Sequence, residues 1–68
     1  MKKEFDYGRE YAEGNRGQEG FDAPVDIEKM LTSTSDIPPD DYHAMKNAGI
    51  ENPDARQYWM GYNSYFEK

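Results

Sequence analysis

The sequence predicts a small all-α protein, a bundle of three to four short helices. Apolar and aromatic residues recur at helical spacing in several segments, no segment of similar length alternates like a β-strand, and stretches rich in glycine or proline separate the helical segments. At 68 residues, one helical domain over residues 1–68 is expected. The chain has no cysteine and one histidine, so packing or a partner chain must stabilise it, without disulfides or a metal.

The first predicted helix runs from Lys2 to Gly14. One side of this helix carries the apolar and small residues Phe5, Tyr7, Gly8, Tyr11 and Ala12. A glycine at position 8 costs about 1 kcal/mol of helix propensity but lets another backbone come close. Gly14 lies at or near the end of the helix, and the glycine-rich segment 15–20 predicts a loop.

The second predicted helix is short, about two turns, and follows Asp22 as an acidic cap and Pro24 as an early proline. Its apolar residues are Val25, Ile27, Met30 and Leu31. The segment 32–39 is rich in Ser, Thr, Asp and Pro and should interrupt the helical structure.

The third predicted helix follows Pro38 and Pro39 and ends at about Asn47. Its apolar side is formed by Tyr42, Met45 and Ala48. Gly49 followed by Ile50 indicates a left-handed cap with a hydrophobic contact.

The last predicted helix covers 53–66, with Asn52 as its cap, Pro53 as its first residue and Asp54 in its first turn. Its aromatic and apolar residues fall within about a third of the circumference: Ala55, Tyr58, Trp59, Tyr62, Tyr65 and Phe66. We expect it to be the most buried helix, with its aromatic side facing the first helix near Gly8.

The charge pattern favours a protein partner. The net charge of −6 argues against direct DNA binding, because phosphate backbones are bound by clustered Lys and Arg. Residues 23–43 carry five acids against Lys29 alone: Asp26, Glu28, Asp36, Asp40 and Asp41. These carboxylates could imitate a nucleic-acid backbone toward a larger partner with a basic surface; they could also be a solvated face with helix caps. Met60, on the outer side of the last helix, is a further predicted partner contact.

Catalysis and cofactors are not expected. His43 lies close to Asp40 and Asp41, but neither a cysteine nor a suitably placed serine accompanies it, and the acids lack the spacing of a calcium loop. The aromatic stripe could stack nucleobases, but only Lys46, Arg56 and Lys68 lie in this region, which favours core packing. No apolar run is long enough to span a membrane, so a cytoplasmic location is expected.

Two segments resemble small bacterial and phage proteins similar to ribosome modulation factor. These segments are 7–14, with Gly8 and Gly14, and 58–62, with Tyr58, Gly61 and Tyr62. The resemblance implies a shared two-helix core and an association with ribosomes or RNA. The chain departs from that family in being acidic and in carrying residues 21–51 as an insertion.

The leading expectation is therefore a non-enzymatic regulator or inhibitor of bacteriophage origin that binds a host nuclease or nucleic-acid-binding protein through a DNA-mimicking acidic face. The alternative is a ribosome- or RNA-associated factor of the family named above.

Overall fold

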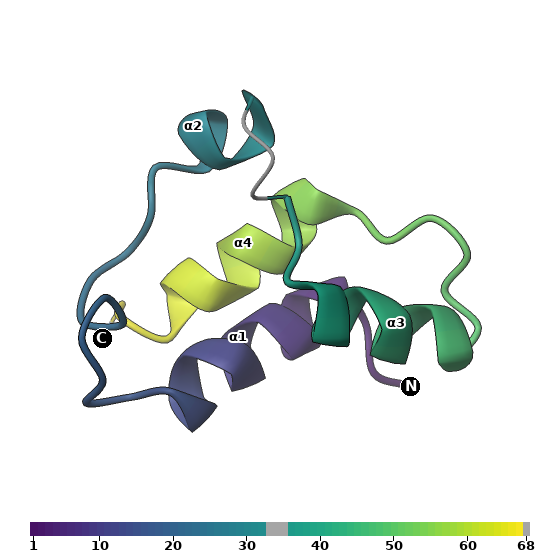
Figure 1. Ribbon diagram of the computed structural model, residues 1–68, viewed down its shortest axis with the longest axis horizontal. Coiled ribbons are helices and arrows are strands. Elements are labelled where there is room, and N and C mark those ends of the chain that lie inside the picture. Colours follow the sequence, from purple (N-terminus) through teal and green to yellow (C-terminus); the bar gives the residue numbers. More distant parts are fainter. Residues whose placement is uncertain (33–35, 68) are drawn as a thin grey trace.

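The computed structural model describes residues 1–32 and 36–67, which form four helices and no strand (Figure 1). The helices are α1 (Glu4–Gly14), α2 (Ile27–Thr32), α3 (Pro39–Asn47) and α4 (Ala55–Ser64). α1 and α4 lie side by side, α2 packs on α4, and α3 lies against α1. The all-α prediction is confirmed.

The crossing of α1 and α4 is a contact between two backbones at two glycines. A Cβ atom on Gly8 would lie 1.7 Å from the carbonyl oxygen of Tyr58, and one on Gly61 would lie 1.9 Å from the carbonyl oxygen of Phe5. Any larger residue at either position would push the helices apart, so the predicted close approach at Gly8 is confirmed. Gly61 is its counterpart on α4.

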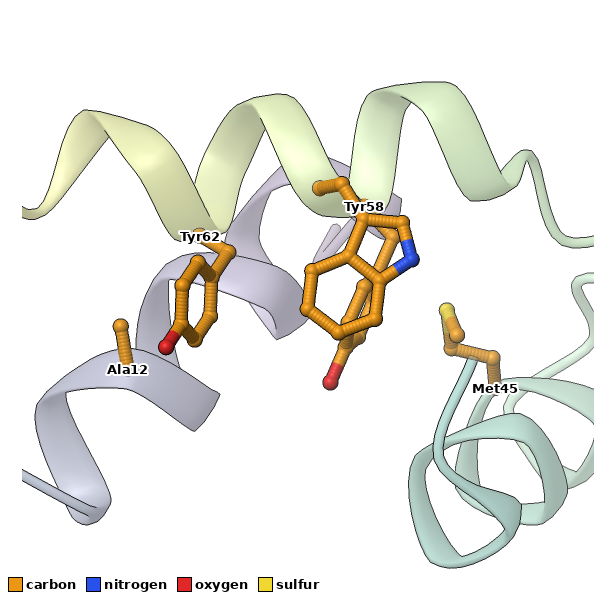
Figure 2. Close-up of a cluster of buried hydrophobic side chains, with 5 residues drawn as sticks. Ala12, Met45, Tyr58 and Tyr62 are labelled. Carbon is orange, nitrogen blue, oxygen red and sulfur yellow. The ribbon is translucent and has the colours of Figure 1, made fainter. Parts of the chain in front are cut away.

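The core is aromatic, as predicted. Its buried members are Ala12, Met45, Tyr58, Trp59 and Tyr62. Figure 2 shows Tyr62 pointing from α4 toward Ala12 of α1, while Met45 reaches the cluster from α3. The rings of Trp59 and Tyr62 meet edge to face at 5.2 Å between centroids, and Tyr11 of α1 lies 6.0 Å from Tyr62. The aromatic side of α4 therefore faces α1, as expected.

The boundaries of α4 differ from the prediction. Its cap is Asp54, whose carboxylate accepts the Gln57 N–H at 3.2 Å, so the helix starts two residues after Pro53. The Asp54 N–H in turn donates to Glu4 of α1 at 3.1 Å, which a sequence pattern cannot reveal. The helix ends at Ser64, and Tyr65 and Phe66 continue in a turn.

α1 begins at Glu4, two residues later than predicted. The Lys3 N–H donates to the carboxylate of Asp6 at 3.1 Å, which marks the helix start. The predicted end at Gly14 is confirmed, and Asn15 caps the helix through its side-chain amide, which donates to the Tyr11 carbonyl at 2.8 Å.

α2 is shorter than predicted, because it begins at Ile27 and Asp22 does not cap it. The cause is Asn63 of α4. Its side-chain oxygen accepts the Val25 N–H at 2.8 Å and its side-chain nitrogen donates to the Val25 carbonyl at 3.0 Å. These two hydrogen bonds hold the segment before α2 against α4. Of the predicted break over 32–39, positions 33–35 lie outside the described residues, and 36–38 are not helical.

α3 ends at Asn47 as predicted, and the left-handed cap is confirmed. Gly49 has φ 97°, and the Ile50 N–H donates to the Met45 carbonyl at 2.9 Å while Ile50 packs on the core. The predicted apolar side of α3 is only partly buried: Met45 is enclosed, whereas Tyr42 is 40 % exposed. α3 contacts α1 over a short stretch only, and Met45 is the buried residue of its predicted apolar side.

Candidate functional site

The predicted partner-binding residues divide among three places. Asp26 and Glu28 lie at α2, Asp36, Asp40 and Asp41 surround the start of α3, and Met60 lies on α4. Two contacts show how far apart the groups are. Glu28 is paired with Arg56, and Asp41 is bonded to Tyr58. Arg56 and Tyr58 are two residues apart on α4, so at 100° per residue their side chains point about 160° apart.

The carboxylates at α2 and at α3 therefore lie on opposite sides of α4. Met60 is one helical turn from Arg56 and shares the α2 side. The chain thus places Glu28 on the same side of α4 as Met60, and it keeps both away from the three acids near α3.

Glu28 and Asp26 have local roles. The Glu28 carboxylate lies 2.8 Å from the Arg56 guanidinium, and both side chains are largely exposed. Asp26 is exposed, and its carbonyl accepts the Met30 N–H as the first hydrogen bond of α2. An exposed ion pair of this kind contributes little stability, but it leaves Glu28 partly neutralised.

Asp41 is a structural partner of the core. Its carboxylate accepts the Tyr58 hydroxyl at 2.5 Å, in a half-buried position. Burial, followed by this hydrogen bond and the charge of Asp41, raises the pKa of Tyr58 far above its ordinary value. Asp41 therefore anchors the start of α3 to α4.

Asp36 and Asp40 are the exposed acids of this group. The backbone carbonyl of Asp36 accepts the indole N–H of Trp59, which fixes the approach to α3 while the carboxylate stays exposed. Within 1–32 and 36–67, no Lys or Arg forms an ion pair with either acid. Both carboxylates are available to a partner.

An open groove lies between the end of α1 and the start of α3. It has a volume of about 500 Å³ and is lined by Tyr11, Asn15, Pro38, Pro39, Asp40 and Asp41. We call it the front groove. Burial first, and then the charge of Asp41, raises the pKa of Tyr11, so the negative potential of the carboxylate reaches the ring on the opposite wall. The sequence indicated the two acids and missed the wall formed by Tyr11 and Asn15.

A second groove lies on the opposite side of α4, around Met60. It has a volume of about 290 Å³ and is lined by Phe5, Ile27, Met60, Asn63, Ser64 and Glu67. We call it the back groove. The sequence indicated Met60, but its helical spacing placed Phe5 in the packed stripe; Phe5 is 37 % exposed because its backbone lies against Gly61.

The structure forms no histidine–carboxylate pair at His43. His43 is exposed and meets the edge of the Tyr42 ring at 5.8 Å, while the neighbouring Asp41 is bonded to Tyr58. In the part of the chain that the structure describes, no three His, Asp or Glu side chains gather as metal ligands. None of the described helices is long and apolar enough to cross a lipid bilayer.

The interpretation of these grooves rests on their own geometry. Comparison with protein-family models, with curated proteins and with solved structures finds no match to this chain.

Proposed function

We propose that this protein is a non-enzymatic binding module that regulates or inhibits a larger protein with a basic surface, such as a nuclease or a nucleic-acid-binding protein. The observation that carries the proposal is the front groove, in which Asp40 and Asp41 lie opposite Tyr11. Carboxylates beside an aromatic ring suit an arginine or lysine side chain, since the acids attract the charge and the ring accepts the cation.

Charge beyond the groove supports a basic partner. The net charge of −6 attracts such a surface over about 10 Å at 0.1 M salt. Five basic side chains donate to acceptors of their own chain: Lys2 to Glu10, Arg9 to Ser64, Arg16 to the Glu13 carbonyl, Lys46 to the Glu51 carbonyl and Arg56 to Glu28. Of these side chains, Lys2 and Arg56 are paired with acids. Because phosphate backbones are bound by clustered Lys and Arg and the chain is acidic overall, a protein ligand is favoured over DNA or RNA.

The test compares two variants that lose the same charge on opposite sides of α4. Asp36→Asn with Asp40→Asn alters the front groove region, and Asp26→Asn with Glu28→Gln is the matched control. Asp41 is kept because Tyr58 depends on it. Partners are captured from a cell lysate with and without nuclease, and association rates with the captured protein are measured at low and high salt.

The front variant is expected to associate roughly tenfold more slowly at low salt, with a smaller difference at high salt, while the control stays close to wild type. Equal rates for the two variants would show that only net charge matters and would overturn the groove as the recognition site. Circular dichroism must first show that both variants keep the wild-type fold.

A ribosome- or RNA-associated factor is the second candidate. The observation that favours it is the contact of Gly8 with α4 and of Gly61 with α1, which joins the two segments that resemble ribosome modulation factor. In the capture experiment this alternative predicts ribosomes or RNA, lost on nuclease treatment, in place of a discrete protein.

A further inference from the structure

The polar atoms on the walls of the front groove are mostly hydrogen-bond acceptors. The carboxylate of Asp40 is exposed, and the Tyr58 hydroxyl uses one of the two carboxylate oxygens of Asp41. The side-chain amide of Asn15 donates to the Tyr11 carbonyl at 2.8 Å, which fixes this amide and leaves its oxygen as a free acceptor. A ligand that fits these walls must therefore be rich in N–H donors.

The same groove has flat walls. The Tyr11 ring is held in place by the rings around it: its centroid lies 5.4 Å from that of Phe21 and 6.1 Å from that of Tyr58. Pro38 and Pro39 line the groove from the start of α3, and neither has a backbone N–H to offer. Rigid rings favour a planar group, and an aromatic ring also attracts a cation over its face.

The charge at the front groove is negative. Of the described residues that line it, none is a lysine or arginine. The hydrogen bond to Glu10 first, and to a smaller degree the charge of Asp41, raises the pKa of Lys2, so this ammonium lies near the groove. It is 2.7 Å from the Glu10 carboxylate, however, and that pair is neutral as a unit. Arg16 lies outside the lining and bonds to the Glu13 carbonyl. The two lining carboxylates therefore leave an excess of negative charge.

We infer that the front groove binds one arginine side chain of the partner and discriminates it from lysine. The inference rests on the proposed function, which leaves open which of the two basic side chains is bound. A guanidinium is planar, always charged, and carries N–H donors along a fork with no acceptor. It can lie against Tyr11 while donating to Asp40 and to the amide oxygen of Asn15. An ammonium is a compact point charge, which satisfies a carboxylate but not the flat wall beside it.

The probe is a synthetic peptide with blocked ends, Gly-Ser-Gly-Arg-Gly-Ser-Gly, titrated at millimolar concentration into the isotope-labelled full chain while amide NMR spectra are recorded. Three control peptides carry lysine, asymmetric dimethylarginine or citrulline in place of arginine. Dimethylarginine keeps the charge but loses N–H donors, whereas citrulline keeps the shape but loses the charge. Shifts are expected around the front groove, with affinity weakened roughly fivefold by lysine or dimethylarginine and roughly tenfold by citrulline.

Equal affinity for the arginine, lysine and dimethylarginine peptides would overturn the inference, because charge alone would then explain binding. Shifts of the same size at the acids of α2, or no shifts at all, would overturn it as well. The proposed function fails on a different result, namely equal association rates of the captured partner with the front variant and its matched control. A basic partner that binds through lysine would leave the proposed function intact.

Variants of the protein give the second arm. Asn15→Ala should weaken the arginine peptide roughly threefold and leave the lysine peptide unchanged, because it removes an acceptor but no charge. Asp40→Asn should weaken both peptides by similar factors. Asn47→Ala, at the exposed end of α3, is the control and should bind both as wild type. Circular dichroism must first show that Asn15→Ala is folded, since this amide caps α1. Equal losses for the two peptides in folded Asn15→Ala would contradict a contact specific to arginine.

Discussion

Two regions of the molecule hold together in different ways. Where α1 crosses α4, backbones touch at Gly8 and Gly61 and aromatic rings fill the space beside them. The middle of the chain, with α2 and α3, adds the buried Met45 and several partly buried apolar side chains to the core, and it is also attached to α4 by separate polar contacts. These are Asn63 to Val25, Tyr58 to Asp41, Trp59 to the Asp36 carbonyl and Arg56 to Glu28.

The two regions differ in what they contribute to stability and to binding surface. The crossing buries large rings continuously, so a change there should act on the whole fold. The middle segment contributes fewer buried side chains, is tied to α4 by individual polar contacts as well, and leaves a groove on each side of α4. Loss of one attachment should loosen one segment.

The largest effect is expected from Trp59→Ala. The variant loses a buried ring that contacts Tyr58 and Tyr62, and the hydrogen bond to Asp36. A loss of about 3–5 kcal/mol would unfold much of a domain this small. Thermal melting followed by circular dichroism measures it, with the exposed Tyr42→Ala as a near-neutral control. A normal melting transition in Trp59→Ala would contradict the core assignment.

Gly8→Ala tests the backbone contact itself. The new methyl group would meet the Tyr58 carbonyl, which cannot move without α4, so a loss of about 3 kcal/mol is expected despite better helix propensity. Gly14→Ala is the matched control: nothing lies within 4 Å of its Cβ position, and a gain of up to about 1 kcal/mol is expected. Urea unfolding of both variants gives the comparison, and similar stabilities would disprove the close crossing.

Asn63→Ala should release the segment before α2. Its amide makes two hydrogen bonds with Val25, and their loss should cost about 2 kcal/mol. Hydrogen exchange should speed up at the amides of α2 and less at those of α1 and α4. Asn47→Ala, at the exposed end of α3, is the control. Uniform loss of protection would mean that α2 and the crossing form one cooperative unit.

Alkaline pH should give the smallest and most gradual effect. Burial and the bond to Asp41 raise the pKa of Tyr58, so the folded protein keeps this proton when the unfolded chain loses it above about pH 10. Stability should be constant below that pH and fall above it, by at most about 1.4 kcal/mol per pH unit for this group.

The control for this pH dependence is Tyr58→Phe, which keeps the ring and removes the ionising hydroxyl. Its melting temperature should start lower but fall less steeply between pH 10 and pH 11, at and just above the ordinary tyrosine pKa of about 10. A residual slope is expected because burial also raises the pKa of Tyr11 and Tyr62. Identical slopes for the variant and wild type would show that Tyr58 does not control the transition.

Local sequence was sufficient to predict the all-α class, the aromatic side of α4, the close approach at Gly8 and the cap at Gly49. Each depends on spacing along one helix or on the conformation of one residue, which are local properties. The acids of 23–43 were also recognised, although their distribution on opposite sides of α4 was not.

The start of α2 and the two grooves depend on tertiary contacts. Asn63 reaches Val25 and Glu4 reaches Asp54 across long separations in sequence, and no periodic pattern records such contacts. Phe5 remains partly exposed because Gly61 brings the α4 backbone against its own. A groove forms where elements distant in sequence meet, so its walls depend on packing geometry, whereas the helices that supply them depend on local sequence.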